Sequence, residues 1–332
     1  MNTNKNFSFV SMRVHSWIIL LCLAFAVSCD RSESKRTVVL YTSIDQPVAA
    51  PIVREFEKQT GIHVVLVTDT EATKSVGLAE KLRAEKSNPQ ADVWWSNEPF
   101  HTINLADEGV LVAYASPSAL DVPAKSKDAD GRWASTGFRV RVIATAGERA
   151  SGLNVLLDPK YREKIAIARP GAGTTGGHVA ALYVLWGDLR ADDFITKLHA
   201  NGAKLLGGNG PVAEAVGAGQ IRLGLTDNDD VKSVQDNGAR IDAILPDQDS
   251  FGTLIVPTTI GLVAGSPHPG EAKQLIDFLL SKQTEQRLID AKFAYGSIRS
   301  PNVKAMDVDY IAVAKKLPEA VRRATAILEG RE

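Results

Sequence analysis

Residues 37–68 read TVVLYTSIDQPVAAPIVREFEKQTGIHVVLVT, and this stretch decides the fold class. The β-branched run at 38–41 predicts a strand, and the valine-rich run at 64–67 predicts a second one. Between them, apolar side chains recur at helical spacing before Gly61, namely Val48, Ile52, Val53 and Phe56. A strand, a helix and a strand in this order favour a parallel pair joined by a right-handed crossover.

The alternation of strands and helices continues along the chain. The first series goes on with a helix at 75–85, a strand at 92–95 and a helix at 100–108. A second series contains strands at 139–144, 165–168, 221–225 and 243–245, with a helix at 177–186. A long apolar strand at 254–263 follows, and then two amphipathic helices at 272–280 and 284–291.

Two long strands frame the second series, which suggests that the chain leaves one domain, builds another and returns. We therefore predict an α/β protein of two lobes, each a mostly parallel sheet flanked by helices. Residues 37–140 plus 254–332 form lobe 1, and residues 141–253 form lobe 2. The strands near 140 and 254 would act as a hinge beside a cleft.

The composition is that of an ordinary globular protein. The chain has 332 residues, of which 44% are hydrophobic and 23% charged, and its formal net charge is -1. This balance excludes a disordered tail protein and a basic nucleic-acid binder. The two cysteines, Cys22 and Cys29, are too few for a disulfide framework and form no zinc motif.

The first residues predict export. Lys5 and Arg13 precede an apolar run at 17–27 that is short for a membrane span, so residues 1–28 are predicted to be a signal peptide. Small residues lead up to Cys29, as in the lipobox of bacterial lipoproteins, and residues 29–36 have the composition of a tether. Lipidation of Cys29 is therefore predicted. The alternative is a plain cleavable signal with a chance cysteine.

Polar loops follow the predicted strands of the first lobe. Ser43 and Asp45 follow the first strand, where they either bind a ligand or cap the next helix. Asn97 and Glu98 follow a strand that ends in two tryptophans. Trp95 either stacks on a ligand or packs in the core.

A glycine-rich loop in the second lobe has the GxGxxG spacing. Residues 171–176 follow a strand and precede a helix, but the following sequence is unlike a dinucleotide site, so we favour an anion site. Its ligands would be backbone N–H groups near Gly173 and the hydroxyls of Thr174 and Thr175. His178, beside this loop, is expected to be packed or exposed to solvent.

Two further loops of the second lobe open helices. Asn209 lies in a glycine-rich loop with accessible backbone groups. Asp227, Asp229 and Asp230 crowd three carboxylates at a helix start, where a cation or a donor would offset their repulsion. The alternative is that Asp227 caps the helix while the other two face solvent.

The chain carries none of the enzyme motifs that we sought. It has no GxSxG elbow, Walker loop or HExxH sequence. We therefore predict a protein that is not an enzyme.

Several segments in a fixed order carry a family resemblance. They are the lipobox, LYTS at 40–43, ADVWWSNE at 91–98, LDPKY at 157–161 and GLTD at 224–227. Together they resemble the ferric-iron-binding type of extracellular solute-binding proteins of ABC transporters, over nearly the whole mature chain. The resemblance implies the two-lobed periplasmic-binding-protein fold, closing over a ligand that is delivered to a membrane permease.

The resemblance also implies a ligand set, which this chain changes. The iron-binding histidine of the family corresponds to Asp45, its glutamate to Asn97 with Glu98 adjacent, and its tyrosine pair to Asp229 and Asp230. The loops that hold the anion in the family correspond to loops of the same kind here, at Gly173, Thr174, Thr175 and Asn209. Carboxylates are hard donors, so Asp45, Asp229 and Asp230 remain candidate metal ligands.

The resulting hypothesis is a lipid-anchored, periplasmic, monomeric binding subunit of an ABC importer. Its cargo would be Fe3+ with a synergistic anion, and its partners would be the permease and ATPase subunits, with no catalytic cofactor and no nucleic acid. One alternative is an organic solute bearing phosphate or carboxylate, bound at Thr174 and Thr175. Another is an exported metal-dependent hydrolase that uses the cluster at Asp227.

Overall fold

The computed structural model describes residues 36–69, 75–171 and 173–331. The predicted signal peptide and Cys29 lie outside these residues. The strands are β1 (Thr37–Thr42), β2 (His63–Thr68), β3 (Val93–Ser96), β4 (Leu111–Val112), β5 (Trp133–Thr145), β6 (Ile165–Ala168), β7 (Lys204–Leu206), β8 (Leu223–Asp227), β9 (Asp242–Ile244) and β10 (Ile255–Val263). The helices are α2 (Gln46–Thr60), α3 (Val76–Ala84), α4 (Phe100–Asp107), α5 (Thr174–Trp186), α6 (Asp188–Ala200), α7 (Asn209–Gly217), α8 (Asn228–Asp236), α9 (Pro269–Leu279), α10 (Lys282–Asp290) and α11 (Tyr310–Leu328).

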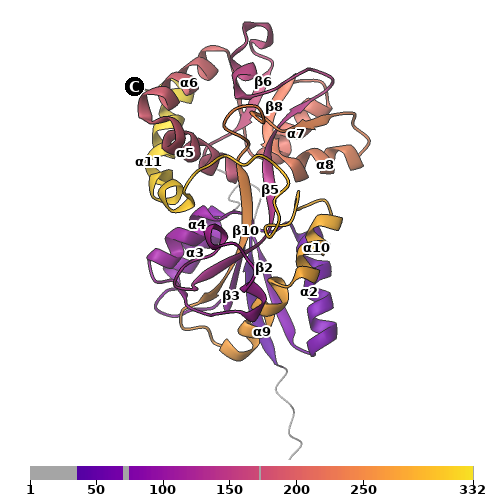
Figure 1. Ribbon diagram of the computed structural model, residues 1–332, viewed down its shortest axis with the longest axis vertical. Helices are drawn as coiled ribbons and strands as arrows, with labels where there is room; N and C mark the ends of the chain where they lie inside the picture. The colour runs from indigo at the N-terminus through magenta and orange to yellow at the C-terminus, as the bar shows by residue number, and fades with distance from the viewer. Residues whose placement is uncertain (1–35, 70–74, 172, 332) are drawn as a thin grey trace, which may run out of the picture. The chain divides into compact units, whose positions relative to one another are not determined.

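The strands form two sheets that share β5 (Figure 1). In the first lobe, β2, β1 and β3 are parallel, and β10 pairs antiparallel with β3 and with the first part of β5. In the second lobe, β7, β6 and β8 are parallel, and the last part of β5 pairs antiparallel with β8 and β9. The predicted α/β class is confirmed. The sheets are mixed, because each lobe has three parallel strands while β10 and β5 pair antiparallel with their neighbours.

Strand β5 changes sheets between two adjacent residues. Val140 pairs with Ile255 of β10, whereas Arg141 pairs with Asp227 of β8. The returning chain also lies here, because the Arg141 backbone N–H donates to the carbonyl oxygen of Leu254 at 3.0 Å. The lobe boundary that we predict between residues 140 and 141 lies next to this change of partner strands, and it stays a prediction.

Several predicted elements have other limits in the structure. Helix α2 ends just before Gly61, as predicted. Gly61 itself has the left-handed backbone conformation, which glycine adopts without strain. Helix α5 begins at Thr174, three residues before the predicted start, so the glycines at 176 and 177 lie inside its first turn. Strand β5 begins at Trp133, well before the predicted start at 139.

The C-terminal helix α11 was absent from the predicted elements. One of its faces is buried, through Val313, Ala314, Leu317, Ala320, Ala324 and Leu328, a spacing typical of an amphipathic helix. It contacts α5 and α6 of the second sheet as well as α4 of the first, and Figure 1 shows it in yellow beside α5. The last part of the chain therefore packs on elements from both sheets.

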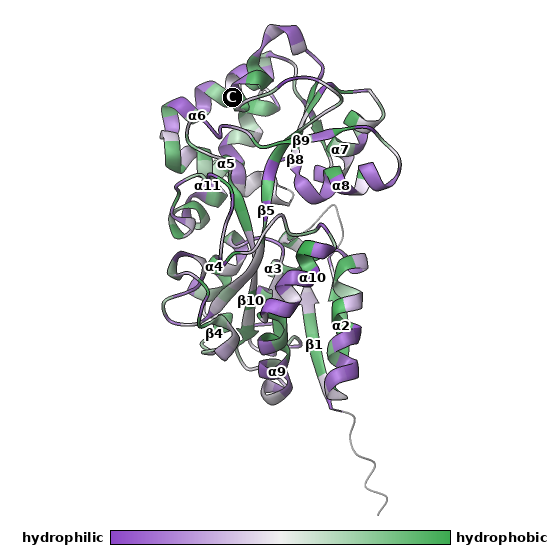
Figure 2. Ribbon diagram, turned by 45° about the vertical axis from the view of Figure 1, so that its right-hand side comes forward, coloured by the Kyte–Doolittle hydropathy of each residue, from purple (hydrophilic) through white to green (hydrophobic). Residues whose placement is uncertain are grey.

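The core of the protein is built around strands β5 and β10. Every residue of β5 and of β10 is buried, as expected for strands that are covered on both faces. Figure 2 shows both hydrophobic and hydrophilic residues along outer helices such as α2, whose buried residues are Ala49, Ile52, Val53 and Phe56. None of the helices in the described ranges combines the length and apolar character needed to cross a bilayer.

Helix α4, in the first lobe, contacts helix α5 at Gly177. The Phe100 ring lies so close to Gly177 that a Cβ atom added there would be 2.1 Å from Phe100 Cε2. Phe100 is 1% exposed and is held on its other side by Tyr310, at 6.0 Å between ring centroids. The ring has little room to move, so this contact requires glycine.

We predict that Gly177→Ala destabilises the protein by about 1–3 kcal/mol, because the new methyl group overpacks the Phe100 ring. Chemical denaturation would measure the loss. The matched control is Gly270→Ala in the first turn of α9, where no atom lies within 4 Å of the added Cβ. Equal stabilities of the two variants would contradict the prediction.

Candidate functional site

The predicted site residues come together where strands of both sheets end. Ser43 follows β1, Asn97 follows β3, and Asp227 ends β8. Helices α5 and α7 begin with Thr174 and Asn209, which are both hydrogen-bonded to Asp227. The carboxyl ends of parallel strands carry ligand sites in open α/β sheets, so this arrangement marks a candidate binding site.

Arg141, on β5, is at the centre of a buried hydrogen-bond network and is 0% exposed. Its Nη1 donates to Asp227 Oδ1 at 2.8 Å, to Thr174 Oγ1 at 2.9 Å and to Asn209 Oδ1 at 3.0 Å. Its Nη2 donates to Thr175 Oγ1 at 3.3 Å. A guanidinium is tolerated in a protein interior when a carboxylate and further acceptors surround it in this way.

The Asp227 carboxylate accepts hydrogen bonds from four side chains. Besides the bond from Arg141 to Oδ1, its Oδ2 accepts from Thr174 at 2.6 Å, from Arg139 at 3.1 Å and from Asn209 at 3.3 Å. Burial raises the pKa of this carboxyl, but the charges of Arg141 and Arg139 outweigh burial and hold the pKa below its ordinary value. The alternative that Asp227 caps α8 is wrong, because its side chain makes no cap hydrogen bond.

Arg139 connects the two lobes. Its Nη1 binds Asp227 and also Asp229, at 3.0 Å to Oδ2, while its Nη2 donates to the backbone oxygen of Asn97 at 2.9 Å. Its guanidinium lies over the Phe293 ring, with Cζ 5.2 Å from the centroid. Burial lowers the pKa of Arg139, but the carboxylates, led by Asp229, raise it above its usual value. Arg139 is therefore a fixed positive charge at the junction of the lobes.

Carboxylates of both lobes lie around the positive charge of Arg139. Asp227, Asp229 and Asp230 each place one oxygen within 4.8 Å of the others. Asp45, at the start of α2, also contributes to the field at Arg139, and it makes no side-chain cap hydrogen bond. The prediction that Asp45, Asp229 and Asp230 share one region is consistent with this geometry. Such oxygens suit hard cations.

Ser43 and Asn97 are bonded to each other in the first lobe. The Ser43 hydroxyl donates to Asn97 Oδ1 at 3.1 Å and accepts from the Asn97 backbone N–H at 2.9 Å. Ser75 joins them, because its hydroxyl donates to the same Oδ1 at 2.6 Å. Ser75 has a φ of 69°, which is rare for serine, and no sequence pattern marked it. The three side chains join the segments that follow β1 and β3 to the start of α3.

Trp95 and Glu98 have structural contacts in this lobe. Trp95 is 0% exposed in the apolar core, and Trp94 is also buried, with its Nε1 donating to Thr102. The Glu98 carboxylate accepts from the backbone N–H of Phe100 at 2.6 Å, in the first turn of α4. Both residues thus stabilise the loop after β3, and a direct role in ligand binding remains a prediction.

The glycine-rich loop leads into the first turn of α5. Gly173 has a φ of 55°, which favours glycine, and an added Cβ would lie 3.4 Å from Asn209 Nδ2. The hydroxyl of Thr174 donates to Asp227, and that of Thr175 donates to Asn209 Oδ1 at 3.0 Å. The hydroxyls that we expected to hold an anion are therefore bonded to groups of the protein itself.

His178 is buried in the next turn of α5, at 1% exposure. Its Nδ1 accepts from Arg141 Nε at 3.4 Å, which places the proton of the neutral ring on Nε2. Burial, helped by the charge of Arg141, lowers its pKa to about 3. Of the two alternatives for His178, a packed side chain is confirmed and a solvent-exposed one is wrong.

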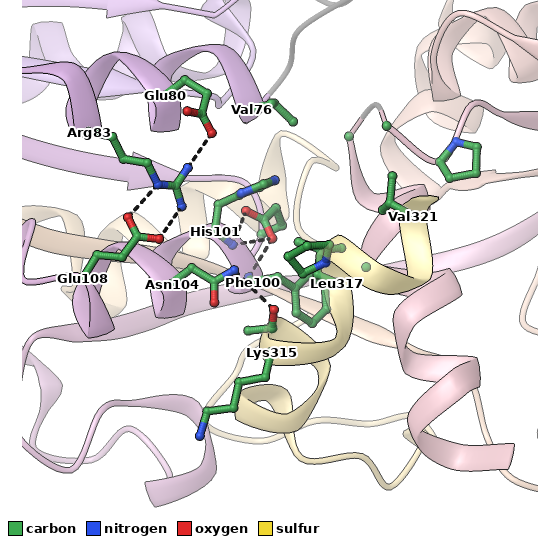
Figure 3. A pocket seen from close by; sticks show the side chains of 18 residues that line it. Val76, Glu80, Arg83, Phe100, His101, Asn104, Glu108, Lys315, Leu317 and Val321 are labelled. Atoms are coloured by element: carbon green, nitrogen blue, oxygen red, sulfur yellow. Dashed lines mark hydrogen bonds and ion pairs between the residues drawn. The ribbon is translucent and has the colours of Figure 1, made fainter. Parts of the chain in front are cut away.

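A cavity of about 520 Å³ lies beside the network (Figure 3). Helices α3 and α4 form one wall, where Arg83 pairs with Glu80 and Glu108, at 2.7 and 2.6 Å. The other wall is formed by the loop before α5 and by α11, with Leu317 and Val321. The cavity has charged and apolar sides, and its size suits a small organic molecule.

The place of Arg139 and Arg141 in this network was not predicted from the sequence. The signal was present, since Arg139, Val140, Arg141 and Val142 alternate within a run predicted as a strand. Residues two apart in a strand share a face, so both arginines point to the same side. What the sequence lacked was the position of their partner Asp227, which lies far along the chain.

Comparison with known proteins gives a family match over most of the chain. The family model of the bacterial extracellular solute-binding proteins matches residues 37–293. A Salmonella typhimurium periplasmic protein named for binding 2-aminoethylphosphonate is 27% identical over 288 residues, which are 83% of this chain and 77% of the relative. The major ferric iron-binding protein of Neisseria meningitidis is 23% identical over 272 residues, covering 78% of this chain and 80% of the relative.

A solved structure shows the same fold. The periplasmic binding protein AfuA from Actinobacillus pleuropneumoniae, with fructose-6-phosphate bound, matches with a TM-score of 0.78 at 21% identity. The match covers 89% of this chain and 99% of that protein. The two-lobed architecture predicted from the sequence is therefore confirmed.

We predict that Arg141→Gln lowers the free energy of unfolding by about 3–5 kcal/mol, because it removes one partner of a buried ion pair. Urea denaturation at pH 7 would measure the change. The control is Lys197→Gln, which removes a pair with Asp193 whose side chains are both 59% exposed and should leave stability nearly unchanged. Similar losses in both variants would refute the importance of the buried pair.

We predict that His178 makes stability fall as the pH drops from about 6.5 toward 3. The unfolded chain binds a proton at this histidine below about pH 6.5, whereas the folded protein does so only near pH 3. This difference costs roughly 1.4 kcal/mol per pH unit inside that window. His178→Gln should therefore flatten the curve of unfolding free energy against pH. Parallel curves for both proteins would contradict this.

Proposed function

The chain belongs to the bacterial extracellular solute-binding proteins, and we propose that it is the binding subunit of an ABC importer that carries a cation, with Fe3+ as its cargo. The ligand would lie between Asp45 of the first lobe and Asp229 and Asp230 of the second. Closure about the hinge near 140 and 254 would bring these carboxylates together around it.

The excess of carboxylates over guanidinium groups carries this proposal. Asp45, Asp227, Asp229 and Asp230 all act on Arg139, and the only arginines of the network in the described residues are Arg139 and Arg141. Among the described side chains of this network, four carboxylates thus lie beside two guanidinium groups. An excess of carboxylates attracts cations and repels anions.

Iron is supported by the type of donor and by the relatives. Carboxylate oxygens are hard ligands, which suit Fe3+ as well as divalent ions. The matched Neisseria protein is named for binding ferric iron. In this chain carboxylates would replace the tyrosines that the family resemblance led us to expect.

The cavity supports a second candidate, an organic solute. A volume of about 520 Å³ is far larger than a metal ion needs, and its walls include both ionic and apolar side chains. The Salmonella relative is named for binding an aminophosphonate, and AfuA was solved with a sugar phosphate. An amine-bearing solute would pair with a glutamate of this lining, with its apolar part against Phe100 and Leu317.

A hydrolase is less compatible with the geometry than binding is. Asp227 is not available as a catalytic base, because it is 1% exposed and accepts from four side chains. We therefore propose that the protein binds its ligand without turnover.

Export and anchoring complete the proposal. The Salmonella relative and AfuA are periplasmic proteins by name, which supports secretion through the predicted signal at 1–28. Lipidation of Cys29 would keep the protein at a membrane, near the permease and ATPase subunits that import its cargo. We propose that it acts there as a monomer.

We predict that Asp229→Asn and Asp230→Asn each weaken Fe3+ binding at least about tenfold, because each removes a charged oxygen ligand. The measurement is thermal stability of the mature domain without Cys29, titrated with ferric citrate, since ligand binding raises Tm by mass action. Divalent metals, 2-aminoethylphosphonate and sugar phosphates complete the set of ligands.

The matched control is Asp236→Asn on the same helix, whose carboxylate is exposed and pairs with Lys232. It should bind as the wild type does. Unchanged iron affinity in both site variants would refute the cation proposal. A Tm shift with an organic solute and none with iron would favour the second candidate.

A further inference from the structure

Three helix starts and two arginines converge on one point of the second lobe. Thr174 begins α5, Asn209 begins α7, and Asp227 is the residue before α8. Helix N-termini carry partial positive charge, and Arg139 and Arg141 add two full charges. This arrangement has the composition of a binding site for a small anion.

The protein fills this site with its own carboxylate. Asp227 accepts bonds from both arginines, from the Thr174 hydroxyl and from the Asn209 amide, at 2.6 to 3.3 Å. All five side chains are nearly buried, with Asn209 the most exposed at 7%. The donors that an external oxyanion would use are therefore already occupied.

We infer that Asp227 acts as a built-in anion that determines specificity. It excludes phosphate, phosphonate and carboxylate groups from the junction of α5, α7 and α8. The site is thereby restricted to ligands that present a cation to Asp45, Asp229 and Asp230. For the cargo this inference rests on the proposed function, but the exclusion of anions rests on the network alone.

Two physical effects favour Asp227 over an external anion. Its carboxylate is tethered to the chain, so it reaches the donors without the entropy cost of bringing in a separate molecule. A second anion beside it would meet a like charge in a buried region, where repulsion is strong. An external oxyanion can enter only when the carboxylate charge is removed.

Asparagine at this position should convert the protein into an anion binder. Asp227→Asn removes the charge and replaces one acceptor oxygen with an NH2 group, which releases part of the donors that Asp227 occupies. Among the described residues, Asp227 is the only carboxylate within ion-pair distance of Arg141. The variant therefore leaves this buried guanidinium without a counterion, which phosphate or sulfate would supply.

The experiment measures phosphate binding by wild-type protein and by Asp227→Asn, using calorimetry and thermal melts in a chloride buffer of matched ionic strength. We expect no binding by the wild type. For the variant we expect a Tm rise of about 5 °C at a phosphate concentration roughly 100 times Kd. Asp229→Asn, which removes a partner of Arg139 but leaves Asp227 in place, should bind no phosphate.

If Asp227→Asn does not fold in chloride, it is refolded in phosphate and in sulfate. Recovery of the folded state by these anions supports the inference, and failure to fold in all three salts overturns it. Phosphate binding by the wild type at this junction, or no binding by a folded variant, also overturns it. If the wild type does not bind Fe3+ but phosphate binds only to Asp227→Asn, the proposed cargo is refuted and the exclusion of anions stands.

Discussion

The buried ion network of Arg139, Arg141 and Asp227 is the constraint on which the rest of the structure depends. Strand β5 is covered along its whole length, so its two guanidinium groups need a carboxylate within the interior. Asp227 is in register with Arg141 across β5 and β8, and its oxygens also reach Arg139. The place where the two sheets meet is thus also the place where charge collects.

The packing of neighbouring elements follows from that junction. Helix α5 starts at the network and is buried from Thr174 to Tyr183, which brings Gly177 against Phe100 of α4. Helix α11 then covers α4, α5 and α6. Contacts between the lobes therefore involve both a polar network and an apolar contact.

The same network gives the site its chemical character. Arg139 and Arg141 would attract anions if they stood alone, but Asp227 neutralises part of their charge and occupies their donors. The carboxylates of Asp229 and Asp230 therefore lie next to arginine donors that Asp227 already occupies. Relatives with this fold are named for different solutes, so the fold alone does not determine the cargo.

The sequence by itself determined the α/β class, the order of most strands and helices, and the loops that carry the site. Periodicity and glycine stops are local signals, so they identified α2, β1 and β3 well. Only the tertiary structure decided that Asp227 binds two arginines and does not cap α8, that Trp95 is in the core, and that Ser75 joins Asn97. These outcomes depend on side chains that are 22 to 88 positions apart in the chain, and no local pattern encodes such distances.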